Sequence, residues 1–167
     1  MKILSLGAGV QSSTILMMSI LGELERLDAA IFADTQWESK ATYRHLWWLA
    51  GQAGAAGIPL YVVTRGDVRT GYYRRKSDEA YRPMPYFTRN SDGSKGMTSR
   101  QCTQNHKIIP IEQQVRRILG VKRITGIGTV ETWLGISMDE MRRVRQAKRK
   151  WQVFRYPLIE DVEMTRG

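Results

Sequence analysis

The residues best suited to chemistry lie in the stretch GAGVQSS, from Gly7 to Ser13, which joins a short apolar run to a second apolar segment. Gly7 and Gly9 allow backbone N–H groups to approach an anion closely, and Ser12 and Ser13 add hydroxyl donors at a helix start. Taken alone, the same residues also suit a simple turn between a strand and a helix. The stretch is neither a Walker loop nor a dinucleotide fingerprint, because the Gly-Lys-Ser/Thr and the third glycine are both missing.

Apolar periodicity along the chain predicts the elements that must position this loop. It predicts strands at 2–6, 29–33, 59–63 and 121–126, and helices from Ser12 or Ser13 to about 27, at about 40–56, at about 104–119 and at 139–151. This alternation predicts an α/β fold, a doubly wound parallel sheet with helices on both faces, built as a single domain over residues 1–167. Ligands of such sheets bind at the carboxyl ends of the strands, where both the opening loop and Asp34 are expected.

Positive charge is concentrated in the second part of the chain. Residues 1–64 have a net charge of −1 and residues 65–167 a net charge of +11, a field that attracts phosphates. The segment 64–100 lacks periodicity and is expected to form a basic, aromatic-rich loop or lid. Together with the expected basic helix at about 139–151, this segment suits the binding of RNA or DNA, with cations on the phosphates and tyrosines stacked on the bases. The alternative is that these cations cover a nucleotide site and a solvated helix face.

Composition limits the cellular setting and the metal chemistry. No apolar run has the length of a membrane span, and the N-terminus lacks the features of a signal peptide. The single cysteine, Cys102, has no partner for an internal disulfide, so a cytoplasmic protein without membrane contact is expected. His45 and His106 do not show the spacing of a zinc site, and no protein metal site is predicted. His45 is expected to pack among aromatic neighbours, and His106 is a candidate phosphate contact.

The opening loop resembles the modified phosphate loop (PP-loop) of the ATP pyrophosphatase superfamily, whose pattern is Ser-Gly-Gly-x-Asp-Ser-Ser/Thr. Residues 7–13 occupy its seven positions, with Gly7 in place of serine, Ala8 in place of glycine and Gln11 in place of aspartate. The glutamine is similar to the branch of phosphoadenosine phosphosulfate (PAPS) reductases, whose loop commonly reads Ser-Phe-Gly-x-Gln.

Two further segments resemble the same family in the same order. FADTQWES, from Phe32 to Ser39, is similar to the Asp-Thr-Gly segment that follows the second strand of those reductases. RQCTQNHKIIPI, from Arg100 to Ile111, is similar to their Cys-x-x-x-x-Lys-x-x-Pro-Leu segment. Together with TGIG at 125–128, the resemblance extends from Lys2 to about Ile159, and it implies an adenine nucleotide alpha hydrolase-like fold.

The resemblance also implies a nucleotide site and an activity. The residues implied to hold the nucleotide are Ser5, Gly7, Ala8, Gly9, Gln11, Ser12, Ser13, Asp34, Thr35 and Gly126. Arg100 and Lys107 would stabilise charge at an α-phosphate, although both also suit a plain surface role near a helix start. The implied activity is cleavage between the α- and β-phosphates of ATP, with Mg²⁺ neutralising the pyrophosphate, to adenylate an acceptor in nucleic-acid or sulfur-transfer chemistry.

Cys102 is the residue on which the sulfur chemistry of this chain would depend. Family members with a four-iron cluster use four cysteines, so this chain alone is not expected to hold an iron–sulfur cluster. Members without a cluster use a cysteine near the C-terminus, which this sequence lacks. Cys102 suits a nucleophile with a lowered pKa or a buried core thiol. Two alternatives therefore stay open: a PAPS reductase-like enzyme that needs a thiol from a partner, and a nucleotide- or nucleic-acid-binding module without catalysis. The partner expected is a second protein or a second copy of this chain.

Overall fold

The computed structural model describes residues 1–69, 87–97, 102–126 and 128–166. Within these ranges a five-stranded sheet has the order β3-β2-β1-β6-β7, and every neighbouring pair is parallel. The strands are β1 (Lys2–Leu6), β2 (Ala29–Asp34), β3 (Leu60–Thr64), β6 (Val130–Leu134) and β7 (Gln152–Arg155). The α/β fold class predicted from the sequence is therefore confirmed.

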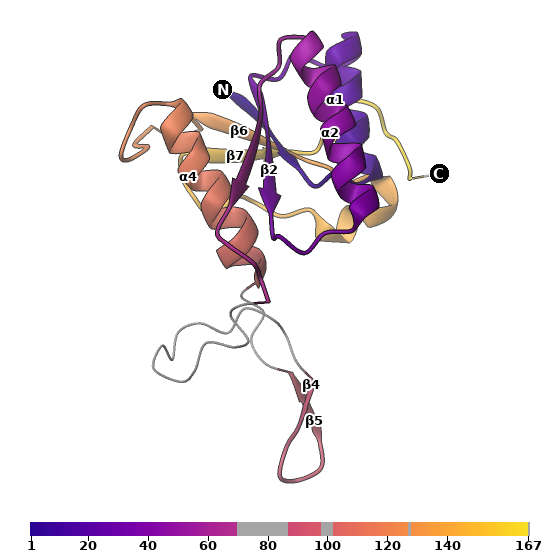
Figure 1. Cartoon of the computed structure of the whole chain (residues 1–167), viewed down its shortest axis with the longest axis vertical. Coiled ribbons are helices and arrows are strands. Elements are labelled where there is room, and N and C mark those ends of the chain that lie inside the picture. Colours follow the sequence, from indigo (N-terminus) through magenta and orange to yellow (C-terminus); the bar gives the residue numbers. More distant parts are fainter. Residues whose placement is uncertain (70–86, 98–101, 127, 167) are drawn as a thin grey trace.

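Helices cover both faces of this sheet (Figure 1), and the strands therefore bury apolar side chains in two core clusters, one on each face. Helices α1 (Val10–Leu21) and α2 (Lys40–Ala55) pack against one face with the strand residues Leu4 and Phe32. Helix α4 (Ile109–Ile118) covers the other face, where Ile111 and Val115 meet Ile3 and Ile31. Each fully buried side chain of this size contributes about 1.5–3 kcal/mol to folding.

Helix α1 begins earlier than its sequence suggests. The prediction that Ser12 or Ser13 caps it is wrong, because Gly9 is the N-cap residue and provides no capping side chain. The helix ends where Gly22 takes a left-handed backbone conformation with a φ of 80°, which glycine adopts without strain. By contrast, α2 has a side-chain cap, since the Ser39 hydroxyl accepts a hydrogen bond from the Thr42 N–H at 3.1 Å.

The predicted strand at 121–126 is wrong, and the strand on the other side of β1 is β6. Lys122 and Arg123 are exposed in the turn that follows α4, whereas Val130 and Trp133 are buried, Trp133 with 2% of its surface exposed. The residues of VETWL therefore supply the apolar contacts of a central strand, although Glu131 and Thr132 interrupt the apolar pattern.

The predicted basic helix at 139–151 is also wrong. A short 3-10 helix, η2 (Met138–Arg143), contains a non-helical residue at Glu140, and residues 144–151 then run without helix to β7. The Tyr156 hydroxyl accepts a hydrogen bond from the Arg145 N–H at 3.0 Å and donates one to the Arg145 carbonyl at 2.7 Å. Because both polar groups of the Arg145 backbone are engaged outside a helix, this tertiary contact overrides the helical propensity of the segment.

Smaller elements complete the described chain. A π-helix, η1 (Gln104–Ile108), precedes α4, and α5 (Pro157–Glu160) places the buried Leu158 under the face that carries α1. The strands β4 (Phe87–Arg89) and β5 (Lys95–Met97) form an antiparallel hairpin that projects away from the sheet in Figure 1. Most of the predicted lid at 64–100 lies outside the described residues. None of the described helices combines the length and the apolar character needed to cross a membrane.

Candidate functional site

A cavity of about 690 Å³ opens at the carboxyl ends of β1 and β6. Its walls come from five segments: the end of β1 with the loop that follows it, the first turn of α1, the residue before η1, the end of β6 with the residues that follow it, and the crossover to β7. The lining residues are Ser5, Gly7, Gly9, Gln11, Ser12, Thr103, Leu134, Gly135, Ile136, Arg143 and Arg145. The site therefore lies where ligands of parallel α/β sheets bind.

The loop after β1 and the first turn of α1 supply Gly7, Gly9, Gln11 and Ser12 to the lining of this cavity. Ala8 has a positive φ of 53°, and the Ser12 hydroxyl accepts from the Gly7 N–H at 3.2 Å and donates to the Gly9 carbonyl at 3.3 Å. The Ser12 hydroxyl thus holds the loop closed. The first helical hydrogen bond of α1 joins the Ser13 N–H to Gly9, so the N–H groups that precede it have no acceptor within the helix. An uncapped helix N-terminus of this kind attracts anions.

Gly135 allows the end of β6 to lie directly against α1. A Cβ atom at this position would stand 2.7 Å from the Ser12 nitrogen and 3.1 Å from the Gln11 carbonyl carbon. Both neighbours are backbone atoms, so neither can rotate away. A residue without a side chain is needed here to bring the two walls of the cavity together.

Gln11 joins the two walls through its side chain. Its amide nitrogen donates hydrogen bonds to the Ser137 hydroxyl at 2.8 Å and to a Glu140 carboxylate oxygen at 2.7 Å. Ser137 in turn donates to Asp139 at 2.6 Å. The hydrogen bond from Gln11, followed by that from Arg143, lowers the pKa of Glu140, and the Ser137 hydroxyl lowers the pKa of Asp139. Both carboxylates are therefore ionised at neutral pH.

Two arginines supply positive charge to the cavity. Arg143 forms an ion pair with Glu140 at 2.8 Å, which leaves further guanidinium N–H donors for a ligand. The Tyr156 hydroxyl fixes the backbone of Arg145. No ion pair found within the described ranges involves the Arg145 side chain. The cavity thus combines a helix N-terminus with a cation that forms no ion pair with a carboxylate in the described part of the chain.

Ala8 and Ser13, which the resemblance places in the nucleotide site, lie away from this cavity. Both line a different, mainly apolar hollow of about 510 Å³ beside α1. There the Ser13 hydroxyl is 2.8 Å from Nε2 of His45, whose ring stacks on Trp48 with the centroids 5.7 Å apart. The predicted packing of His45 among aromatic neighbours is confirmed. Five other residues of the predicted nucleotide site do line the larger cavity: Ser5, Gly7, Gly9, Gln11 and Ser12.

Asp34 and Thr35 lie at the same edge of the sheet but do not line the cavity. Asp34 accepts hydrogen bonds from the Tyr43 hydroxyl at 2.7 Å and from the Gln36 N–H at 2.8 Å. Burial, followed by this contact with Asp34, raises the pKa of Tyr43. Thr35 donates to Glu38 at 3.0 Å. In this structure the two residues hold the turn between β2 and α2.

The predicted catalytic segment contributes a different residue from those expected. Thr103 lines the cavity, whereas Lys107 is exposed and Cys102 is half-buried, and neither lines it. Arg100 lies outside the described residues. His106 has only 1% of its surface exposed, and its burial lowers its pKa. The sequence-based role of His106 in a phosphate contact thus has no support from its buried position.

Gly126 is not brought to the site. It precedes β6, so it lies toward the amino ends of the parallel strands, whereas the cavity lies at their carboxyl ends. On that side the cavity is instead lined by Gly135, Arg143 and Arg145, none of which was predicted as a nucleotide-site residue. A glycine immediately after the strand-like run VETWL was the one signal that pointed to this wall.

The chemistry open to this site is the binding of a phosphate-bearing ligand. Within the described ranges there is no group of three His, Cys, Asp or Glu side chains arranged to hold a metal ion. Mg²⁺ usually reaches nucleotide sites held by the phosphates with one or two carboxylates, and such binding needs no protein cage. Comparisons with family models, with curated proteins and with solved structures found no match to this chain.

Proposed function

We propose that this chain is an ATP-dependent enzyme of the PP-loop type, with a doubly wound, adenine nucleotide alpha hydrolase-like fold. The triphosphate of ATP lies in the cavity between α1 and the end of β6. One observation carries the proposal: an uncapped helix N-terminus opens on a cavity of about 690 Å³ that two arginines border. This volume is within the range of about 300–1,000 Å³ that small-ligand sites occupy. The resemblance of the loop to phosphate loops supports the same ligand.

The reaction proposed is the transfer of the adenylyl group to an acceptor. An oxygen of the acceptor attacks the α-phosphorus, a new phosphorus–oxygen bond forms, and the bond to the bridging oxygen of the β-phosphate breaks. Pyrophosphate leaves with the electron pair of that bond. Mg²⁺ bound to the phosphates would neutralise part of the charge of the leaving pyrophosphate.

The residues of this chain act by holding and neutralising the phosphates. The N–H groups at the start of α1 donate hydrogen bonds to phosphate oxygens, and the helix dipole favours their charge. Arg143 and Arg145 stabilise the negative charge that develops during the transfer. Gln11 acts as a positioning residue, because its hydrogen bonds to Ser137 and Glu140 fix the segment that carries Arg143.

The test compares Arg143→Gln with Arg142→Gln. The two arginines are neighbours in η2 and both are exposed, but only Arg143 lines the cavity. Calorimetry should show ATP with Mg²⁺ binding to the wild-type protein, and Arg143→Gln should weaken it about tenfold, equivalent to about 1.4 kcal/mol. Arg142→Gln should bind ATP as the wild type does.

A second readout addresses the reaction itself. Incubation with ATP, Mg²⁺ and candidate acceptors should release AMP or adenylated acceptor together with pyrophosphate. Binding of ATP without pyrophosphate release under any condition would leave a nucleotide-binding module and would contradict the enzymatic proposal. Displacement of ATP by PAPS at much lower concentration would instead favour the sulfonucleotide alternative.

A further inference from the structure

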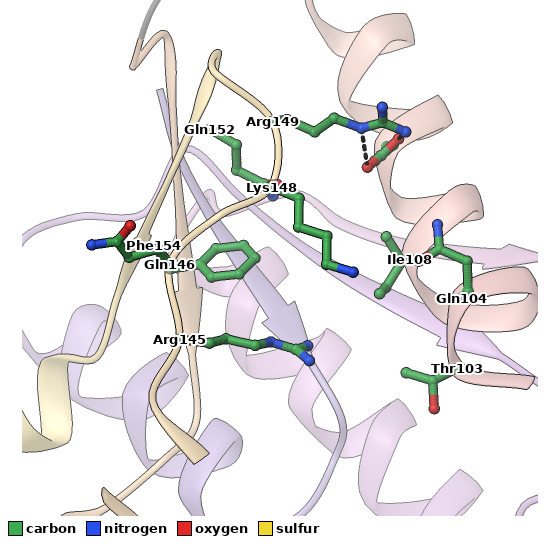
Figure 2. A pocket seen from close by; sticks show the side chains of 10 residues that line it. Thr103, Gln104, Ile108, Arg145, Gln146, Lys148, Arg149, Gln152 and Phe154 are labelled. Carbon is green, nitrogen blue, oxygen red and sulfur yellow. Dashed lines mark hydrogen bonds and ion pairs between the residues drawn. The ribbon is translucent and has the colours of Figure 1, made fainter. Parts of the chain in front are cut away.

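A second cavity, of about 360 Å³, lies on the side of the sheet that carries α4 (Figure 2). It is bounded by η1 and α4 on one side and by the crossover between β6 and β7 on the other. The residues that matter for its chemistry are Thr103, Gln104, Ile108, Arg145, Lys148 and Phe154. The function proposed above assigns it no ligand.

Charge in this cavity is positive and only partly compensated. Glu112, with 8% of its side chain exposed, forms ion pairs with Arg149 at 3.3 Å and with Arg116 at 3.8 Å, so this carboxylate is already neutralised. Figure 2 shows Lys148 reaching from the crossover toward Ile108 and Gln104. Among the described residues, no ion pair engages Lys148 or the side chain of Arg145. An anionic ligand would supply the missing partner.

The cavity also has an aromatic wall. Phe154 and Ile108 provide apolar surface, and the Gln104 side chain adds one amide with both donor and acceptor atoms. A flat, weakly polar ring that carries a phosphate matches this combination, because the ring stacks on Phe154 while the phosphate meets Lys148. The volume is near the lower end of the range for small-ligand sites and suits a single nucleotide unit.

The two cavities are adjacent, since Thr103 and Arg145 line both of them. The Tyr156 hydroxyl holds the Arg145 backbone between the two. A nucleotide unit in the second cavity would therefore lie next to the triphosphate in the first. Six of the nine residues from 142 to 150 are Lys or Arg, and those outside the cavity, such as Arg142, are exposed. These outer cations suit phosphates on either side of the bound unit.

We propose that the second cavity holds one nucleotide of a single-stranded nucleic acid, which is the acceptor of the adenylyl transfer. The phosphate of this nucleotide contacts Lys148, its base stacks on Phe154, and Arg145 connects it to the ATP site. The role of the nucleic acid as acceptor rests on the proposed function, whereas the binding of the strand does not depend on it.

The test measures fluorescence anisotropy of labelled oligothymidylate and oligouridylate of about ten nucleotides, a length typical of one strand-binding surface. Lys148→Gln should weaken binding about fivefold or more at low salt and reduce the slope of log affinity against log salt by about 0.7. Phe154→Leu should weaken binding about tenfold with little change in that slope, because it removes stacking and keeps the charge. The matched control is Lys122→Gln, which removes one exposed charge at the opposite edge of the sheet.

Equal binding by Lys148→Gln and Lys122→Gln, or no binding of either oligonucleotide by the wild type, would overturn the proposal. Competition by free TMP or UMP as effective as by the oligonucleotide would show a site for a small phosphorylated molecule and would overturn the assignment of a strand. ATP binding, measured by calorimetry on the same variants, should be unchanged and controls for folding. A wild-type protein that binds the strand in this pattern but not ATP would contradict the proposed function alone.

Discussion

Replacing Gly135 with alanine tests how the cavity is built. The new Cβ would stand 2.7 Å from the Ser12 nitrogen, and reaching an ordinary contact of 3.4 Å requires the end of β6 and α1 to separate by about 0.7 Å. Overpacking of this kind costs about 1–3 kcal/mol, which for a chain of this size lowers the melting temperature by about 2–12 °C. Because the displaced backbone belongs to Gln11 and Ser12, which line the cavity, ATP should also bind about tenfold more weakly.

The matched control for Gly135→Ala is Gly51→Ala. Gly51 lies in the exposed interior of α2, and a Cβ there would meet no atom within 4 Å. The same chemical change should therefore raise stability by about 0.5–1 kcal/mol, because alanine loses less backbone entropy in a helix. Thermal unfolding and calorimetric ATP titration measure both variants. A Gly135→Ala protein that melts no lower than the wild type and binds ATP equally well would refute the close approach of β6 to α1.

Two pH-dependent predictions concern Gln11 at the cavity and the buried His106. The hydrogen bond from Gln11 lowers the pKa of Glu140, so the wild type should melt above Gln11→Met at pH above 4.5, and the difference in melting temperature should narrow as the pH falls through the lowered pKa. The hydrogen bond from Gln11 to Ser137 does not titrate and accounts for the difference that is left in acid. A difference of the same size at neutral and acid pH would contradict the stabilisation of the Glu140 carboxylate by Gln11. Burial lowers the pKa of His106 below 6.5, so the unfolded chain takes up a proton that the folded chain refuses. In urea titrations the wild type should lose stability as the pH falls below 6.5, His106→Leu should lose less, and equal losses would contradict the assignment.

Elements that follow from local patterns were predicted closely from the sequence. The apolar run at 29–33 corresponds to β2 at Ala29–Asp34, and the helix predicted at about 40–56 corresponds to α2 at Lys40–Ala55. In both segments neighbouring residues determine the element: a continuous apolar run forms the buried strand β2, and the Ser39 cap marks the start of α2. The glycine loop after β1 was found for the same reason, and Gly7, Gly9, Gln11 and Ser12 line the cavity together with Ser5 at the end of the strand.

The opposite wall of the cavity depends on contacts between distant parts of the chain. VKRITG has a more strand-like pattern than VETWL, yet only the second run is buried, because Trp133 and Val130 meet the core on the two faces of the sheet. The basic stretch at 142–150 has good helix formers, but Tyr156 engages the backbone of Arg145. Since both predictions failed in this region, the positions of Gly135, Arg143 and Arg145 could not be obtained from the sequence.

The most direct test of the proposed ATP site is a crystal structure of the protein with a non-hydrolysable ATP analogue and Mg²⁺. The proposed site requires phosphate oxygens within hydrogen-bond distance of the N–H groups at the start of α1, with Arg143 beside the phosphates. A nucleotide bound elsewhere on the chain, or a cavity without nucleotide at a concentration that saturates binding in solution, would contradict it.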